Sequence, residues 1–281
     1  MHIVSNSVQT IKDKLKNVSK EKNVDFNSVM RFYMYDRFIE RLSKSKYRDN
    51  FIVKGGFYLS KLFGLDNRST MDIDTAIRKV KFTEENLIKI INEIIDIDIG
   101  DNVNFKIDKI KPIRDEDEYG GLRITINFML DNIKDKFHID LATGDPIYPR
   151  PDNYKYESLL GNEVYKIWTY NLETVLAEKI ETILSKLETS SRMKDYYDVY
   201  LIYKFKFDKI NKEKFKFAVE KTFGKRKFEA NLIKNLNILK ESKILRDRWI
   251  SYSRKNSYSK EVTFDETLKC LEQFVYIIIS S

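Results

Sequence analysis

Residues 51–77 read FIVKGGFYLSKLFGLDNRSTMDIDTAI, and this stretch decides the fold that we expect for the rest of the chain. Its first three residues are apolar and predict a short buried strand. Gly55 and Gly56 follow and allow the backbone to approach a ligand closely. The apolar residues after them recur at three- and four-residue spacing, as in a short helix packed on a sheet. This order places backbone N–H groups at a helix N-terminus, where a phosphate can bind.

The same stretch ends in Asp72-Ile73-Asp74 within a second strand-like run. Successive strand side chains alternate between faces, so Asp72 and Asp74 share one face. Two adjacent carboxylates raise each other's pKa unless a cation lies between them. Hard oxygen ligands beside an anion site suit Mg²⁺ that carries a nucleoside triphosphate. The simpler alternative is a glycine turn followed by an exposed acidic strand end.

This motif resembles the first motif of the AbiEii/AbiGii nucleotidyltransferase toxins, which belong to bacterial type IV toxin–antitoxin and abortive-infection systems. The resemblance implies that Asp72 and Asp74 are catalytic metal ligands. It also implies that the nucleotide is bound by the remaining motif residues, which are Lys54, Gly55, Gly56, Arg68 and Thr70. The broader superfamily favours Gly-Ser where this chain has Gly-Gly. A hydroxyl contact to phosphate would then come from Ser60, Ser69 or Thr70.

A third acid follows on a later predicted strand, Phe-His-Ile-Asp-Leu at 137–141. Its apolar residues face the core, which leaves His138 and Asp140 on the opposite face. Asp140 matches the acid of the family's second motif, would complete the metal site and would help to deprotonate the attacking hydroxyl. The alternative is a strand-end aspartate paired with a lysine. His138 has no second His or Cys nearby, and we expect it to be structural.

Two helical segments carry the third and fourth motifs of the resemblance. Lys179 lies near the apolar stripe of a helix that Asn171 opens, so it needs an anionic partner, which is either protein or phosphate. The resemblance implies that Lys179 contacts the nucleotide phosphates, whereas the alternative is a lysine that extends past an apolar edge. In the fourth motif, Arg192, Asp195 and Asp198 share a helix face. We expect Asp195 to be essential and Asp198 to support Lys179 or Arg192, although ordinary helix ion pairs have the same spacing.

Composition indicates an ordinary globular protein with a localised basic excess. The chain has 281 residues and a net charge of +8, and residues 201–260 hold 18 Lys and Arg against 6 Asp and Glu. Such a segment suits a polyanion, and the alternative is a lysine-rich solvated surface. Trp249, Tyr252 and Tyr258 interleave there with basic residues and could stack on RNA or belong to the core. The single cysteine, Cys270, is expected to be buried.

The remaining elements are read from periodicity and capping residues. We expect helices at 5–20 and 27–45, with Ser5 and Asn27 as N-caps and Arg31, Arg37 and Arg41 facing solvent. Thr83 is expected to cap a further helix, and alternating strands are expected at 103–110 and 122–130. Prolines at 146, 149 and 151 mark a soft boundary near 150–165, after which the pattern is helical.

The prediction is an α/β (α+β) protein with two domains. Residues 1–160 would form a nucleotidyltransferase-like mixed sheet of about five strands, and 161–281 a helical domain with the later motifs. The resemblance implies nucleotide transfer from an NTP with Mg²⁺ to an RNA 3′ end, with tRNA as the substrate class, and growth arrest. It also implies an antitoxin that acts at the gene level. With no membrane segment or secretory signal, we expect a cytoplasmic location. The alternatives are a transferase that modifies a protein or small molecule and a non-catalytic nucleotide- or RNA-binding module.

Overall fold

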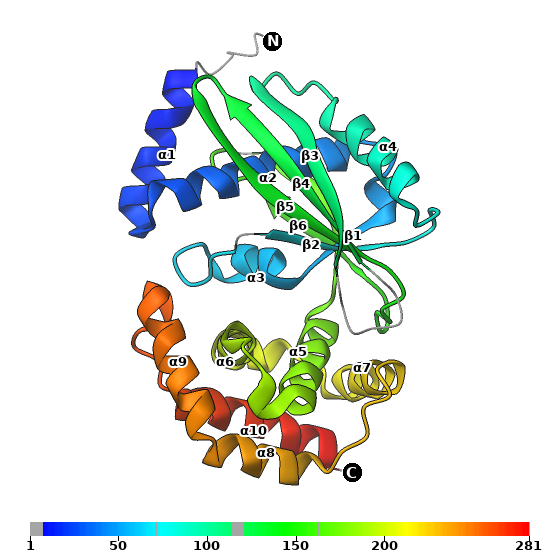
Figure 1. Cartoon of the computed structure of the whole chain (residues 1–281), viewed down its shortest axis with the longest axis vertical. Coiled ribbons are helices and arrows are strands. Elements are labelled where there is room, and N and C mark those ends of the chain that lie inside the picture. The colour runs from blue at the N-terminus through cyan, green and yellow to red at the C-terminus, as the bar shows by residue number, and fades with distance from the viewer. Residues whose placement is uncertain (1–7, 71, 114–120, 162, 281) are drawn as a thin grey trace. The chain divides into compact units, whose positions relative to one another are not determined.

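The structure is a computed structural model that describes residues 8–70, 72–113, 121–161 and 163–280. The chain forms two compact units. The sheet unit comprises Met1–Gly144 and Asp152–Thr169, and the helical unit comprises Asp145–Pro151 and Tyr170–Ser281. A mixed sheet followed by a run of helices confirms the predicted fold class (Figure 1).

The sheet has seven strands in the order β3-β4-β5-β2-β1-β7-β6. Its parallel pairs are β2 with β5 and β1 with β7, and the other neighbours are antiparallel. The strands are β1 (Phe51–Lys54), β2 (Asp72–Ile77), β3 (Val103–Ile113), β4 (Gly121–Leu130), β5 (Ile133–Ala142), β6 (Asp152–Glu157) and β7 (Val164–Thr169). The expectation of helix after the prolines is wrong for β6 and β7, which extend the sheet beyond the predicted strands.

Side-chain alternation on the long strands β3–β5 separates an apolar face from a polar one. Ile124, Ile126 and Phe128 are buried on one face of β4, and helix α2 packs there because Phe137 of β5 contacts its Tyr35 at a ring distance of 5.2 Å. Figure 1 shows α2 passing behind these strands. The helices of this unit are α1 (Val8–Lys22), α2 (Phe26–Lys44), α3 (Gly55–Phe63) and α4 (Glu84–Ile95).

Helix α2 differs from the prediction at its start and in its arginines. Asp25 is the N-cap instead of Asn27, because the Asp25 side chain accepts a hydrogen bond from the backbone N–H of Ser28. The predicted cap Ser5 lies outside the described residues. Thr83 does precede α4, but its side chain makes no capping hydrogen bond.

The expectation that the arginines of α2 face solvent is wrong for Arg37 and Arg41, which are buried. Arg41 donates two hydrogen bonds to Asp101, at 2.8 and 2.9 Å. The reason is that α2 is covered around most of its circumference, so an arginine buried there needs a carboxylate partner. Arg31 keeps partial exposure and pairs with Asp135 at 2.8 Å.

The helical unit begins with the segment 145–151, which Asn171 ties to the following helix. The Asn171 amide donates to the carbonyl oxygens of Tyr148 and Arg150 and its oxygen caps the helix at the N–H of Thr174. Cys270 is buried as predicted. No helix among the described residues is long and apolar enough to cross a membrane. The helices are α5 (Leu172–Lys186), α6 (Met193–Lys206), α7 (Lys212–Lys225), α8 (Leu232–Glu241), α9 (Lys243–Lys255) and α10 (Phe264–Ile279).

Candidate functional site

Three carboxylates meet on the open face of the sheet unit. Asp72 and Asp74 lie on the same face of β2, while Ile73 between them is fully buried on the other face. The parallel pairing of β2 with β5 sets Asp74 directly beside Asp140. The sequence predicts one site for these three residues, and the strand register of the structure brings them together.

Arg123 of β4 is a site residue that sequence reasoning missed. The antiparallel pairing of β4 with β5 sets Arg123 opposite Asp140. Its Nε and Nη2 atoms donate to the two Asp140 oxygens, at 2.7 and 2.6 Å, and Nη2 also lies 3.6 Å from Asp72. The available signal was that Arg123 is the charged residue on the polar face of the predicted strand at 122–130.

In this site the three carboxylates lie close together, and the guanidinium of Arg123 contacts two of them, Asp72 and Asp140. Burial raises the pKa of Asp72 above its usual value, Arg123 opposes that rise, and the charges of Asp140 and Asp74 add to it. The hydrogen bonds with Asp140 raise the pKa of Arg123 above its ordinary value, so the guanidinium stays charged. A second cation beside Asp72 would therefore be favourable.

A glycine is required at position 55 by the position of Asp74. Gly55 has φ of +64°, and a Cβ atom there would lie 2.1 Å from Oδ2 of Asp74. The backbone N–H of Gly56, in the first turn of α3, donates to the same oxygen at 3.2 Å. A helix N-terminus thus meets the carboxylate site, and one of its N–H groups already bonds an anionic oxygen.

Arg68 and Thr70 pack against the second glycine. A Cβ atom at Gly56 would lie 2.9 Å from Nη2 of Arg68 and 3.0 Å from the hydroxyl of Thr70. The Thr70 hydroxyl donates to the Asp72 carbonyl at 3.2 Å. Ser60 is buried, and its hydroxyl donates to the Gly56 carbonyl within α3. Of the three predicted hydroxyl sources, Thr70 therefore lies beside the turn and the carboxylate strand. Lys54 is paired in register with Asp74.

The donor set fits a hard divalent cation at Asp72 and Asp74. Both are carboxylates on one strand face, and oxygen ligands of this kind bind Mg²⁺. Among the described residues, no group of three or more His, Cys, Asp or Glu is arranged to hold a metal ion. Both oxygens of Asp140 accept hydrogen bonds from Arg123.

In the helical unit, Lys179 lies in a buried charge cluster. Its ammonium is 2.8 Å from Oδ1 of Asp195 and 2.6 Å from Oδ2 of Asp198. Arg192 contacts Asp195 at 2.6 Å and keeps 49% of its side chain exposed, whereas both carboxylates are fully buried. The anionic partners that Lys179 requires are thus protein carboxylates from α6.

The ionisation of the cluster is set by its internal pairs. Burial alone would raise the pKa of Asp195, but Lys179 and Arg192 hold it well below its ordinary value. Burial likewise opposes the charge of Lys179, and Asp195 and Asp198 nevertheless raise its pKa. Asp195 and Lys179 are therefore ionised at neutral pH.

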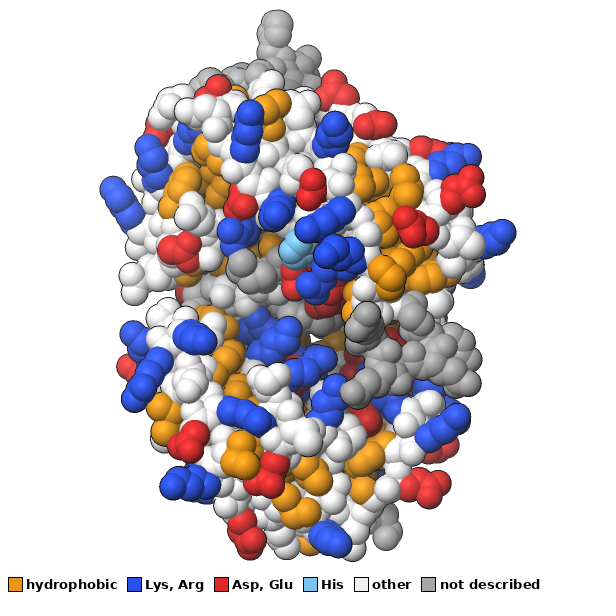
Figure 2. All heavy atoms as spheres, viewed as in Figure 1, with side chains coloured by type: hydrophobic (Ala, Val, Ile, Leu, Met, Phe, Trp, Pro, Cys, Tyr) orange, Lys and Arg blue, Asp and Glu red, His pale blue; other side chains and the backbone are white. Residues whose placement is uncertain are grey.

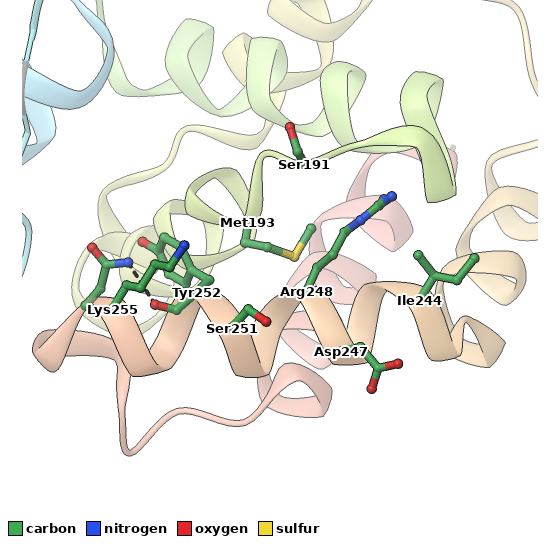
Figure 3. Close-up of a pocket in the computed structure, with 9 residues that line it drawn as sticks. Ser191, Met193, Ile244, Asp247, Arg248, Ser251, Tyr252 and Lys255 are labelled. Carbon is green, nitrogen blue, oxygen red and sulfur yellow. Dashed lines mark hydrogen bonds between the residues drawn. The ribbon is translucent and has the colours of Figure 1, made fainter.

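The aromatic and basic residues of the helical unit divide into two groups. Trp249 is buried and donates from its indole to the Val262 carbonyl, so it belongs to the core. Tyr252 and Lys255 instead border a hollow of about 520 Å³ (Figure 3). Arg248 extends toward the loop before α6, where it donates to the carbonyls of Glu188 and Ser190.

Comparison with known proteins identifies the family of this chain. Residues 37–270 match the model of a family described as "Nucleotidyl transferase AbiEii toxin, Type IV TA system". No curated protein matches the sequence.

A solved structure shares the fold at low sequence identity, and a second is similar at a lower TM-score. A Helicobacter pylori crystal structure described as a candidate nucleotidyltransferase matches with a TM-score of 0.52 and 15% identity, covering 91% of this chain and 96% of that one. The H. pylori protein JHP933 matches with a TM-score of 0.49 and 15% identity, covering 88% of each chain.

Proposed function

Since this chain belongs to the AbiEii nucleotidyltransferase toxins of type IV toxin–antitoxin systems, we propose that it transfers nucleotides from a nucleoside triphosphate to an RNA 3′ end, with tRNA as the substrate class. The observation that carries the proposal is the meeting of Asp72, Asp74 and Asp140 beside the Gly55-Gly56 turn. Carboxylates for a metal and backbone N–H groups for phosphate then lie in one place.

In the proposed reaction the RNA 3′-oxygen forms a bond to the α-phosphorus, and the bond from that phosphorus to the bridging oxygen of pyrophosphate breaks. Mg²⁺ would be held by Asp72 and Asp74 and would supply positive charge at the triphosphate. The 3′-hydroxyl proton passes to a carboxylate of the site, for which Asp140 is the candidate. Arg123 orients Asp140 through two hydrogen bonds. The Gly55-Gly56 turn, with Lys54, Arg68 and Thr70 around it, binds the triphosphate.

We further propose, from the family resemblance, that Lys179 and Arg192 contact the nucleotide phosphates. Asp195 and Asp198 fix the ammonium of Lys179, which keeps 8% side-chain exposure. Arg192 shares Asp195 and is far more exposed, so a phosphate can reach it most directly. Both groups remain charged in the cluster and suit stabilisation of developing negative charge. The outcome that we propose is growth arrest, relieved by an antitoxin that acts at the gene level.

The test is transfer of label from each α-³²P-labelled NTP, with Mg²⁺, to total bacterial tRNA. We expect label on RNA with wild-type protein and a loss of about 10²-fold or more with Asp72→Asn. Asp108→Asn, an exposed acid at the β3 bulge, is the matched control and should retain transfer. Full transfer by a folded Asp72→Asn protein, judged by circular dichroism, would refute the assignment. Label on protein or small molecules alone would refute the RNA substrate.

A further inference from the structure

The open face of strands β3–β5 carries a set of lysines that the carboxylate site does not use. The pairing of β4 with β5 puts Asn127 beside Lys136 and Met129 beside Lys134, on the same face as Arg123 and Asp140. The pairing of β3 with β4 extends each row to the sheet edge. The lysines of this face, which we call the lysine face, are Lys106, Lys109, Lys111, Lys134 and Lys136.

These five lysines are all exposed. None forms an ion pair within the described part of the chain, whereas Arg31 and Lys12 of the same unit are paired with Asp135 and Asp131. Asp140 is the one carboxylate among the described residues that this register places on the face of β3–β5. Such a set of unneutralised charges repels itself, so it is stabilised by a bound polyanion.

The lysine face also contains a hollow of about 700 Å³. Its lining includes Lys106, Lys134 and Lys136 together with Asn104, Asn127 and Met129. Phe105, Phe128 and Asp135 also line it, and the charge of Asp135 is paired with Arg31 at 2.8 Å. Met129 keeps 39% of its surface exposed and adds an apolar contact to the hollow. Amide groups that can bond base edges, an apolar contact and flanking ammonium groups suit a nucleic acid strand better than an acidic peptide.

Figure 2 shows the same clustering on the molecular surface. Blue side chains gather around the pale-blue histidine, with red side chains directly below them. By the strand register, His138 lies on the lysine face of β5 between Lys136 and Asp140, opposite Thr125 of β4. His138 is the register partner of Asp72, so the basic cluster adjoins the carboxylates.

We propose that the lysine face binds the single-stranded 3′ segment of the RNA substrate and leads its terminal hydroxyl to Asp72, Asp74 and Asp140. This inference rests on the proposed function and adds where the RNA lies. Same-face residues of a strand are about 7 Å apart, so Lys134 lies roughly 20 Å along β5 from Asp140. The face thus covers a few nucleotides, with phosphates on the lysines and bases against Met129 and the two asparagines.

The experiment compares three full-length proteins by fluorescence anisotropy with a labelled single-stranded oligoribonucleotide over a range of salt concentrations. The face variant is Lys106→Ala/Lys134→Ala/Lys136→Ala, which keeps the lysines nearest the carboxylates. The control variant is Lys14→Ala/Lys20→Ala/Lys89→Ala, which removes as many exposed lysines from α1 and α4. NTP binding is followed in parallel by calorimetry, because it reports the Gly55-Gly56 turn and not the lysine face.

We expect the face variant to lose about tenfold or more in RNA affinity, and its slope of log affinity against log salt to fall by roughly 2, since each lost phosphate contact removes about 0.7. The control variant should match the wild type, and NTP binding should persist in both. Equal RNA affinity and slope for the face and control variants would overturn the inference and leave the proposed transfer to RNA intact. Wild-type protein that binds polyglutamate in preference to RNA would overturn the inference, and absence of label on tRNA would separately overturn the proposed function.

Discussion

Replacement of Lys179 by methionine tests whether the buried charge cluster stabilises the helical unit. The Lys179 side chain is 8% exposed and its partners Asp195 and Asp198 are 0% exposed. Methionine keeps much of the volume but removes the cation that both carboxylates share. Removal of one partner from a buried ion pair costs about 3–5 kcal/mol, because the remaining charge is left uncompensated in the interior. We expect a loss of that size in the free energy of unfolding.

The assay is urea unfolding followed by fluorescence of Trp249 in a Trp168→Phe background. Trp249 is buried in the helical unit, and the sequence has only these two tryptophans, so the signal reports that unit. Lys194→Met on α6 is the control, and as an exposed substitution it should change stability by about 0.5 kcal/mol at most. Adding Asp198→Asn to Lys179→Met should recover part of the loss. A loss below about 1 kcal/mol for Lys179→Met would refute the reasoning.

The same pair of proteins gives a pH signature. The folded-state pKa of Asp195 lies below its ordinary value of 3.8, so its ionisation contributes stability above that pH, and the contribution is lost as the pH falls through the folded-state value. The stability difference between wild type and Lys179→Met should therefore be constant near neutral pH and shrink below about pH 4. An equal difference at pH 7 and pH 3 would contradict the assigned pairing.

Two further perturbations have sharp expectations. Arg41→Met should lower the free energy of unfolding by about 3–5 kcal/mol, because it leaves the buried carboxylate of Asp101 without its cation. Arg31→Met removes a partly exposed ion pair and should lower it by about 1 kcal/mol or less. Urea unfolding of the two variants measures the difference. Gly55→Ala should cost at least about 1–2 kcal/mol from its φ of +64°, and it should weaken NTP binding in calorimetry because its Cβ displaces Asp74. Gly224→Ala, where no heavy atom lies within 4 Å of the added Cβ, should do neither, and equal behaviour of the two glycine variants would contradict the crowding argument.

Much of the secondary structure, and the shared face of Asp72 and Asp74, could be predicted from local periodicity. Alternation identified the strands that became β3, β4 and β5, and it placed Asp72 and Asp74 on one face, because a strand fixes side-chain direction without reference to its neighbours. The helical periods of α2 and α5 were similarly readable. These features depend on residues a few positions apart, which a single sequence displays directly.

Features that depend on pairing between distant segments could not be predicted from local patterns. Arg123 bonds Asp140 because the strand register sets the two residues opposite each other, and local sequence does not show which strands are neighbours. Arg41 is buried because Asp101, sixty residues later, supplies its carboxylate. Asp198 was expected to support Lys179 or Arg192, and the packing of α6 on α5 pairs it with Lys179. The pairing of Lys179 with Asp195 was not predicted.

Strands β6 and β7 were missed for a different reason. β6 is an edge strand with Tyr156 as its buried residue, so its sequence lacks the apolar alternation of a central strand. The prolines before it were read as the end of the sheet, although the chain returns to the sheet after them. β7 does alternate, with Tyr165 and Ile167 buried, and that short pattern was a usable signal.

Because β6 and β7 return to the sheet after segment 145–151, the two units cannot be exchanged separately by gene recombination. The backbone passes between the two units at 144–145, 151–152 and 169–170, so neither unit is one continuous stretch of the gene. A recombination event that joined the first 150 codons to another gene would omit β7 and leave β1 with a bare hydrogen-bonding edge, which favours aggregation. A junction at Tyr170 would in turn separate segment 145–151 from Asn171, which donates to the carbonyls of Tyr148 and Arg150, so the toxin is expected to be exchanged between genomes as a whole reading frame.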